Sequence, residues 1–134
     1  MPDSLSLTSS DLYLRLQANL PAGYTDQRVK YPNAPFTATV NEKWIWPVII
    51  IRTKDNVEAG GEYTRTYGDF AISINYPKGQ FDQLQLQDAE LLKTAFQNQS
   101  FGNTRCQESQ IDIVGEFESW YTVRIIVKFY FEGI

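Results

Sequence analysis

The chain has 134 residues, of which 43% are hydrophobic, 14% aromatic and 21% charged. These values predict one folded domain with one core, residues 1–134, and they exclude a disordered chain. The net charge of −4 and the pI of about 4.8 exclude a protein that binds nucleic acid through an overall basic charge. No His and a single Cys, Cys106, are present, so the commonest general base and metal ligand are missing and no intrachain disulfide can form. We expect no cofactor and no metal.

The N-terminal part predicts a helix followed by an extended linker. Residues 5–20 form the expected helix, with Thr8 or Ser9 as its cap and Asp11 completing a capping box. The apolar residues that recur every four positions are Leu12, Leu16 and Leu20. This helix packs on the core of its own chain or, alternatively, on a neighbouring subunit. Prolines restrict residues 21–39, and the absence of a basic leader or a long apolar run argues against secretion and against a membrane.

The strongest apolar run, WIWPVIII, predicts a strand within residues 40–54. Pro47 requires an edge or a bulge, so we expect the regular strand at Val48–Lys54, with Trp44 and Trp46 on an entry segment. Because both faces are apolar from Val48 to Ile51, this segment should be covered on both sides. A helix could cover one face and a partner chain the other.

Alternating patterns predict three further strands and a second helix. The strands lie at residues 62–76, 104–114 and 120–132, and the helix at 81–97. The expected apolar stripe of that helix consists of Leu84, Leu91, Leu92, Ala95 and Phe96. The predicted fold class is therefore α+β, with an antiparallel or mixed four-stranded sheet and two helices packed on one face. The predicted order is α-β-β-α-β-β, and the loop at residues 55–62 forms the tip of a projecting hairpin.

Side chains that could carry chemistry are few. Glu116 and Glu118 are better explained as a solvated turn than as an acid/base pair, and Asp55 with Glu58 and Glu62 lacks calcium-loop spacing. Without a histidine beside it, Cys106 is better explained as a buried small hydrophobe. The aromatic residues that could stack on bases or sugars, or instead lie in a core or subunit interface, are Trp44, Trp46, Tyr63 and Tyr67.

The order of elements and four short motifs carry a family resemblance. The motifs are Tyr67-Gly68-Asp69-Phe70, Tyr76-Pro77-Lys78-Gly79, Ala95-Phe96 and Trp120-Tyr121. With a proline-containing segment that ends in NAPF before the first strand, they make the chain resemble the tail terminator-like family of tailed bacteriophages and prophages, related to the lambda tail terminator. The resemblance spans nearly the whole chain. It depends on residues that begin, bend or end helices and strands rather than on catalytic or ligand-binding residues.

The resemblance implies a non-enzymatic virion protein that forms a homo-oligomeric, typically hexameric, ring. Such a ring caps the head-proximal end of the tail tube, stops tube polymerisation and offers the surface that joins the head. The implied partners are the tail tube protein and a head-completion or connector protein; DNA passes through the lumen without specific binding, and assembly takes place in the host bacterial cytoplasm. The expected subunit or tube contacts are Trp44, Trp46, Asp55, Asn56, Val57, Glu58, Gly60, Gly61, Glu62 and Tyr63. The alternatives are another head–tail connector or tail completion protein of related fold, and a small-ligand or carbohydrate-binding module.

Overall fold

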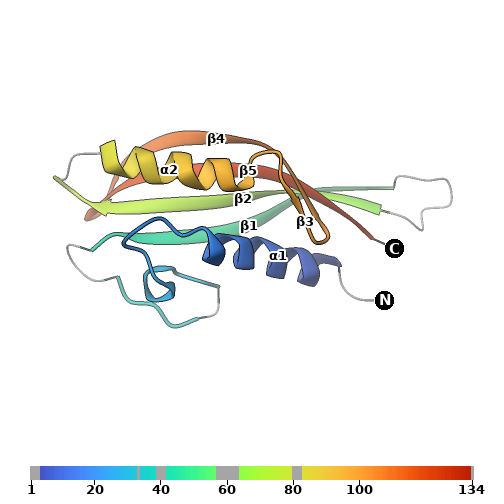
Figure 1. Cartoon of the computed structure of the whole chain (residues 1–134), viewed down its shortest axis with the longest axis horizontal. Helices are drawn as coiled ribbons and strands as arrows, with labels where there is room; N and C mark the ends of the chain where they lie inside the picture. The colour runs from blue at the N-terminus through green and yellow to red at the C-terminus, as the bar shows by residue number, and fades with distance from the viewer. Residues whose placement is uncertain (1–3, 33, 39–41, 57–63, 80–82, 134) are drawn as a thin grey trace.

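The computed structural model describes residues 4–32, 34–38, 42–56, 64–79 and 83–133. Its elements are α1 (Ser4–Ala18), a 3-10 turn η1 (Asp26–Arg28), β1 (Trp44–Asn56), β2 (Thr64–Pro77), α2 (Gln83–Phe96), β3 (Ser100–Phe101), β4 (Thr104–Phe117) and β5 (Trp120–Gly133). Figure 1 shows α2 lying over the sheet, roughly along the long strands, and α1 running beside β1.

The sheet corrects the predicted fold class. It has five strands in the order β1-β2-β5-β4-β3, all neighbours are antiparallel, and it curls into a half-barrel that makes the molecule mostly β. The prediction of four strands, of a mixed sheet and of the order α-β-β-α-β-β was therefore wrong. The extra strand, β3, has two residues, Ser100 and Phe101, which are too few to show an alternating pattern in the sequence. The predicted hairpin tip at residues 57–63 lies outside the described residues.

One face of the sheet supplies the core. The side chains of Phe70, Ile72 and Ile74 on β2 are fully buried, and their partners on β5 in the register are Val127, Ile125 and Val123. The helix residues in this same cluster are Leu12 and Leu16 of α1 and Ala89, Leu92 and Phe96 of α2. We call this the helix face of the sheet. Asp11 of α1 anchors the helix to the start of β4. Its carboxylate accepts hydrogen bonds from the Asn103 N–H (2.8 Å) and the Thr104 hydroxyl (3.2 Å).

Several predicted details of the elements were wrong, each for an identifiable reason. Helix α1 begins at Ser4 rather than at a Thr8 or Ser9 cap, and Thr8 is buried within it. Strand β1 begins at Trp44, so the two tryptophans belong to the strand and not to an entry segment. In α2, Leu84 and Leu91 are exposed, whereas Gln85 is fully buried. Its amide Nε2 donates to the carbonyls of Ile74 and Tyr121, at 2.8 Å each, which compensates for burying a polar group.

The strands carry local irregularities that limit how they pair. Register shifts lie between Ile51 and Thr53 in β1, and between Cys106 and Ser109 and between Ile113 and Gly115 in β4. Such bulges bend a strand and interrupt its pairing. Among the described helices, none is long and apolar enough to cross a membrane.

Candidate functional site: an open, apolar sheet edge

The outer edge of β1 has almost no partner. Its first residues are covered by the linker, since Val29 forms a parallel bridge with Ile45 and the Lys30 N–H donates to the Ile45 carbonyl at 2.8 Å. Beyond Ile45, no residue in the described part of the chain pairs with this edge. Because backbone direction alternates along a strand, the polar groups of Pro47, Ile49 and Ile51 point outward as those of Ile45 do. Pro47 is tolerated because its missing N–H faces this open side, as the sequence predicted.

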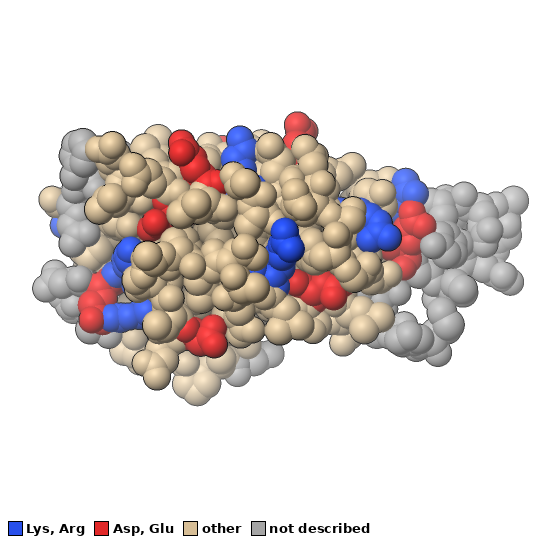
Figure 2. Space-filling view, viewed as in Figure 1, with Lys and Arg blue, Asp and Glu red and all other residues tan. Residues whose placement is uncertain are grey.

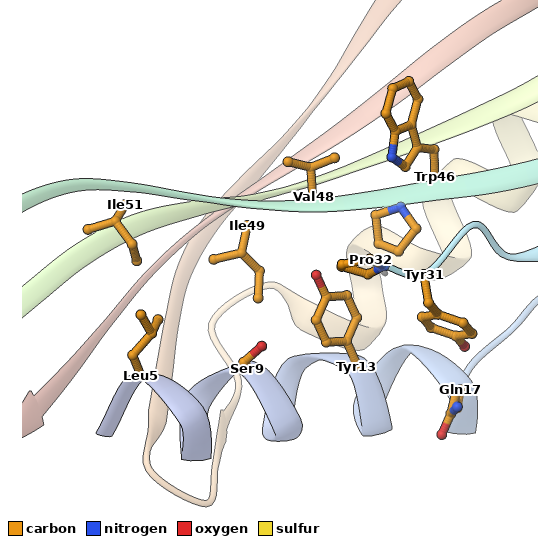
Figure 3. A pocket seen from close by; sticks show the side chains of 11 residues that line it. Leu5, Ser9, Tyr13, Gln17, Tyr31, Pro32, Trp46, Val48, Ile49 and Ile51 are labelled. Atoms are coloured by element: carbon orange, nitrogen blue, oxygen red, sulfur yellow. The ribbon is translucent and has the colours of Figure 1, made fainter. Parts of the chain in front are cut away.

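A groove of about 690 Å³ runs between this edge and α1. We call it the edge groove, and Figure 3 shows Ile49 and Ile51 pointing from β1 towards α1, whereas Trp46 and Val48 project from the other side of the strand. Its lining residues are Leu5, Ser9, Tyr13, Gln17, Tyr31, Pro32, Trp46, Pro47, Val48, Ile49 and Ile51. The helix residues recur every four positions, so they share one side of α1 while Leu12 and Leu16 face the core. A single helix therefore serves both the core and the groove.

The open strand β1 is unusually apolar for a solvent-exposed element. Val48 is 37% exposed, Ile50 47% and Ile51 43%. These three exposed branched residues lie within four positions of β1, beside unpaired backbone groups, and form a template on which another strand can pair. Arg52, at the bulge, ends the apolar run and forms an ion pair with Asp69 at 2.9 Å.

The helix wall is held rigidly by aromatic packing. The ring of Tyr13 makes edge-to-face contacts with Tyr31 at 5.9 Å and with Phe70 at 5.6 Å between ring centroids. The Tyr31 hydroxyl donates to the Asp26 carboxylate at 3.2 Å. Burial, together with the negative charge of Asp26, raises the pKa of Tyr31 to about 12, so this hydroxyl stays protonated and acts as a donor. The groove thus offers shape and apolar surface rather than a general base.

The predicted contact residues do not form one site. Trp44 and Asp55 lie at opposite ends of β1, which places them about 35 Å apart at the usual rise of a strand. Asp55 is exposed, and Asn56 ends the strand, whereas the predicted contacts Val57, Glu58, Gly60, Gly61, Glu62 and Tyr63 lie outside the described residues.

The two tryptophans also differ from each other in access to solvent. Trp44 is buried between Phe36 and Trp120, while Trp46 is partly exposed and borders the edge groove. The Trp46 ring stacks on Trp44, with 6.3 Å between ring centroids. The Lys30 ammonium lies 4.1 Å from the centroid of the Trp46 ring. Both indoles are thereby engaged within the chain, which disfavours their use as a sugar-stacking platform.

The opposite edge of the sheet is also largely open. β3 pairs with β4 only at Thr104 and Arg105, and the neighbouring backbone bonds reach no further than Gln107. From Glu108 to Phe117, no described strand pairs with the outer side of β4, where the Ser109 N–H donates to the Gln97 side-chain oxygen at 3.4 Å. Ile113 is 59% exposed on this edge. The sheet therefore has two open edges, one on β1 and one on β4.

A polar cluster between the linker and α2 is structural rather than catalytic. The Tyr76 hydroxyl donates to the Asp88 carboxylate at 2.7 Å, and the Lys43 ammonium lies 3.7 Å from the same carboxylate. Burial, with the nearby Tyr76 and Asp88, raises the pKa of Tyr24 far above its ordinary value. Burial also raises the pKa of Tyr76, so neither phenol serves as a base near neutral pH. The cluster fixes the linker against α2.

The remaining candidates for chemistry are equally limited. Cys106 is buried, and burial raises the pKa of its thiol to about 12, which makes it a poor nucleophile. Within the described residues, no group of three or more Cys, Asp or Glu side chains could hold a metal ion. In Figure 2, basic and acidic side chains are interspersed on the visible face, without a large area of one sign.

The edge groove was only partly foreseen. The apolar residues on both faces from Val48 to Ile51 predicted cover by a helix and a partner chain. Val48, Ile50 and Ile51 are exposed within the chain, and the covering partner stays a prediction. Leu5 and Tyr13 were missed as groove residues, because their spacing on α1 is the same as that of a core-facing stripe. Comparisons with known proteins do not add a name: no protein-family model matches the chain, and no curated protein has a similar sequence.

Proposed function

We propose that this chain is a structural virion protein similar to phage tail terminators, whose copies form a ring on the head-proximal end of a tail tube. In this role the ring stops tube polymerisation and presents the head-joining surface. The observation that carries the proposal is the open, apolar edge of β1 beside the edge groove, because such a surface is built to be covered by protein. The hexameric state and the virion location come from the family resemblance.

The positions of the resemblance motifs support a role in shaping the subunit. Tyr67–Phe70 lies opposite the bulge of β1, and Tyr76–Gly79 ends β2. Ala95-Phe96 ends α2, and Trp120-Tyr121 begins β5. All four motifs fix the places where strands and helices bend, end or begin, so they specify a shape that can be repeated around a ring.

Deleting the gene from its phage or prophage genome tests the proposal directly. Negative-stain electron microscopy of the lysate should show tails longer than those of the parent, since nothing stops tube growth. Tails of normal length that fail to join heads would instead support the alternative, a tail completion or connector protein. Normal virions would refute both.

A ligand-binding module is the remaining alternative, and the engaged state of Trp44 and Trp46 argues against it. A thermal-shift screen with glycans and small metabolites provides the check. A reproducible rise in melting temperature that is lost in Trp46→Ala would favour this alternative over assembly.

A further inference from the structure

We propose that copies of this chain join edge to edge, with β1 of one copy pairing antiparallel with β4 of the next. The inference rests on the proposed function in one respect, because it describes how the subunits of that ring would meet. It starts from two edges of one sheet along which no described strand of the same chain pairs, at Val48–Asn56 and at Glu108–Phe117. On the second edge, the Ser109 N–H donates to the Gln97 side-chain oxygen at 3.4 Å, and a neighbouring strand would have to displace this one bond. A contact between different edges is heterologous, so it can continue from copy to copy and close a ring.

The strand directions fit this contact. Each neighbour in the order β1-β2-β5-β4 is antiparallel, so β1 and β4 run in opposite directions. Rotating a copy about an axis that lies along the strands preserves the direction of each strand. The β1 strand of that copy then arrives antiparallel to β4, and the sheet continues without a change of type. The same rotation keeps the helix face on the same side in every copy.

The lengths of the two free segments also agree. In β4, the regular stretch between bulges is Ser109–Ile113. In β1, the regular stretch before the bulge is Trp44–Ile51, and its uncovered part is Val48–Ile51. Both segments are short enough to pair without crossing an irregularity. The bulges therefore define where the contact begins and ends.

The edge groove has room for the side chains that this pairing would bring. Ile111 and Ile113 pair with the core residues Ile125 and Val123, so they point to the helix face. In the joined sheet they fall next to Ile49, between β1 and α1 of the neighbour, which is the position of the groove (Figure 3). A stable contact needs about 800 Å² from each partner, more than a four-residue strand pair alone supplies. Filling the groove adds the missing apolar area.

Charge distinguishes this pairing from the two symmetric ones. The charged groups near the open edge of β1 are mainly basic: Lys30, Arg52 and Lys54 against Asp55, with Arg52 paired to Asp69. Those along β4 are acidic: Glu108, Asp112 and Glu116, of which Glu108 lies 3.7 Å from Lys128 and Glu116 lies 3.9 Å from Lys78. A β1–β4 contact brings opposite charges together, whereas β1–β1 and β4–β4 contacts oppose like charges, which is destabilising.

Cross-linking with a short bismaleimide tests the pairing in the full chain. Thr53→Cys places an exposed thiol just beyond the bulge of β1, and Gln110→Cys places one within the free segment of β4. The double variant should give a ladder of covalent oligomers, while each single variant should stay monomeric on a denaturing gel. The unmodified chain is the control for Cys106, whose burial keeps it from reacting.

A second pair of variants tests the edge without cross-linking. Ile50→Lys puts a charge on the open strand, and Leu91→Lys is its matched control, since Leu91 is similarly exposed on α2. Native mass spectrometry over a concentration series should show that Ile50→Lys raises the midpoint of association about tenfold or more. Leu91→Lys should leave that midpoint unchanged.

The outcomes separate this inference from the proposed function. Dimers formed by either single-cysteine variant alone would overturn the β1–β4 pairing in favour of a symmetric contact. Oligomers in native mass spectra without any cross-linked ladder would overturn the pairing and leave the ring intact. A monomer at every concentration and salt would overturn both. A β1–β4 ladder combined with normal virions after gene deletion would support the pairing and overturn the terminator role.

Discussion

Replacing Gln85 by Met should lower the free energy of unfolding measurably, although both side chains have similar length. The Gln85 amide donates to the carbonyls of Ile74 in β2 and Tyr121 in β5, so one side chain ties α2 to two central strands. Losing the two bonds leaves two buried acceptors without that donor, at about 1–2 kcal/mol each. The Gln85 Oε1 atom is buried and has no hydrogen-bond partner among the described residues. Removing this atom therefore stabilises the variant by about 1 kcal/mol and offsets part of the loss.

The net expectation for Gln85→Met is a loss of about 1–3 kcal/mol. For a chain of 134 residues this corresponds to a drop in Tm of roughly 4–11 °C. Chemical denaturation followed by tryptophan fluorescence and differential scanning calorimetry measure the two quantities. Gln87→Met, at an exposed position of the same helix, is the matched control and should change stability by less than about 0.5 kcal/mol.

Gln85→Glu provides the decisive comparison, because an ionised carboxylate cannot donate to the two carbonyls. Burial raises the pKa of such a carboxyl in the folded state above its unfolded value, so the protonated form is favoured on folding. Its stability deficit should therefore shrink as the pH falls towards about 4, where the unfolded carboxyl also becomes protonated. Unchanged stability in Gln85→Met, or a pH-independent deficit in Gln85→Glu, would refute the proposed role of the amide.

Three further predictions concern the close backbone contact at Gly68, the anchoring of α1 by Asp11 and the burial of the Cys106 thiol. A Cβ at Gly68 would lie 2.7 Å from the Ile50 carbonyl and from the Phe129 ring, so Gly68→Ala should cost about 1–3 kcal/mol in urea denaturation. Asp11→Ala removes two charge-assisted bonds that anchor α1, and should cost about 1.5–3 kcal/mol in the same assay. Burial raises the pKa of the Cys106 thiol from 9.0 to about 12, so it should resist alkylation in the folded chain at pH 9. Its contribution to stability is complete below pH 9 and is lost as the pH rises towards 12.

Each of these expectations has a result that contradicts it. A Gly68→Ala protein as stable as the parent would mean that Phe129 moves aside freely. Ser10→Ala, at an exposed neighbour of Asp11, is the control for anchoring and should be neutral. For Cys106, alkylation as fast as in urea would show that the thiol is accessible. The stability difference between the parent and Cys106→Ala should narrow above pH 9, and a constant difference would contradict the effect of burial.

The sequence revealed the parts of the fold that depend on long, regular patterns. The alternation of apolar residues from Phe70 to Tyr76 and from Tyr121 to Phe131 predicted the two central strands. It could be read from the sequence because the apolar residues of each strand are buried on one face of the sheet. The periodicity of the helices was also readable, but the orientation of α2 was not. Leu84 and Leu91 looked like core residues, although Gln85 is the residue that enters the core. That choice depends on the carbonyls of two distant strands, which no local pattern encodes.

The candidate site shows the same division. Pro47 predicted an edge, because that signal lies within one short segment, and β1 is an edge strand. The covering partner predicted from the apolar faces of Val48–Ile51 stays a prediction. The groove itself requires α1 and β1 to lie side by side, and their sequence positions give no sign of this. Trp44 was predicted as a contact residue because it is a large aromatic residue, but packing against Trp120 buries it.

The strand order β1-β2-β5-β4 also has a consequence for how the chain folds. β2 pairs with β5, from which α2, β3 and β4 separate it in sequence, whereas β1–β2 and β4–β5 are neighbours along the chain. During synthesis, β2 therefore keeps one bare side until β5 has left the ribosome, and the core between them closes in a single late step. Long-range pairing of this kind folds more slowly than local pairing. Pulsed hydrogen exchange during refolding should show that the β2 amides that point towards β5 gain protection together with β5. A nascent chain halted before Trp120 should leave those β2 amides unprotected, while the amides that point towards β1 can be protected.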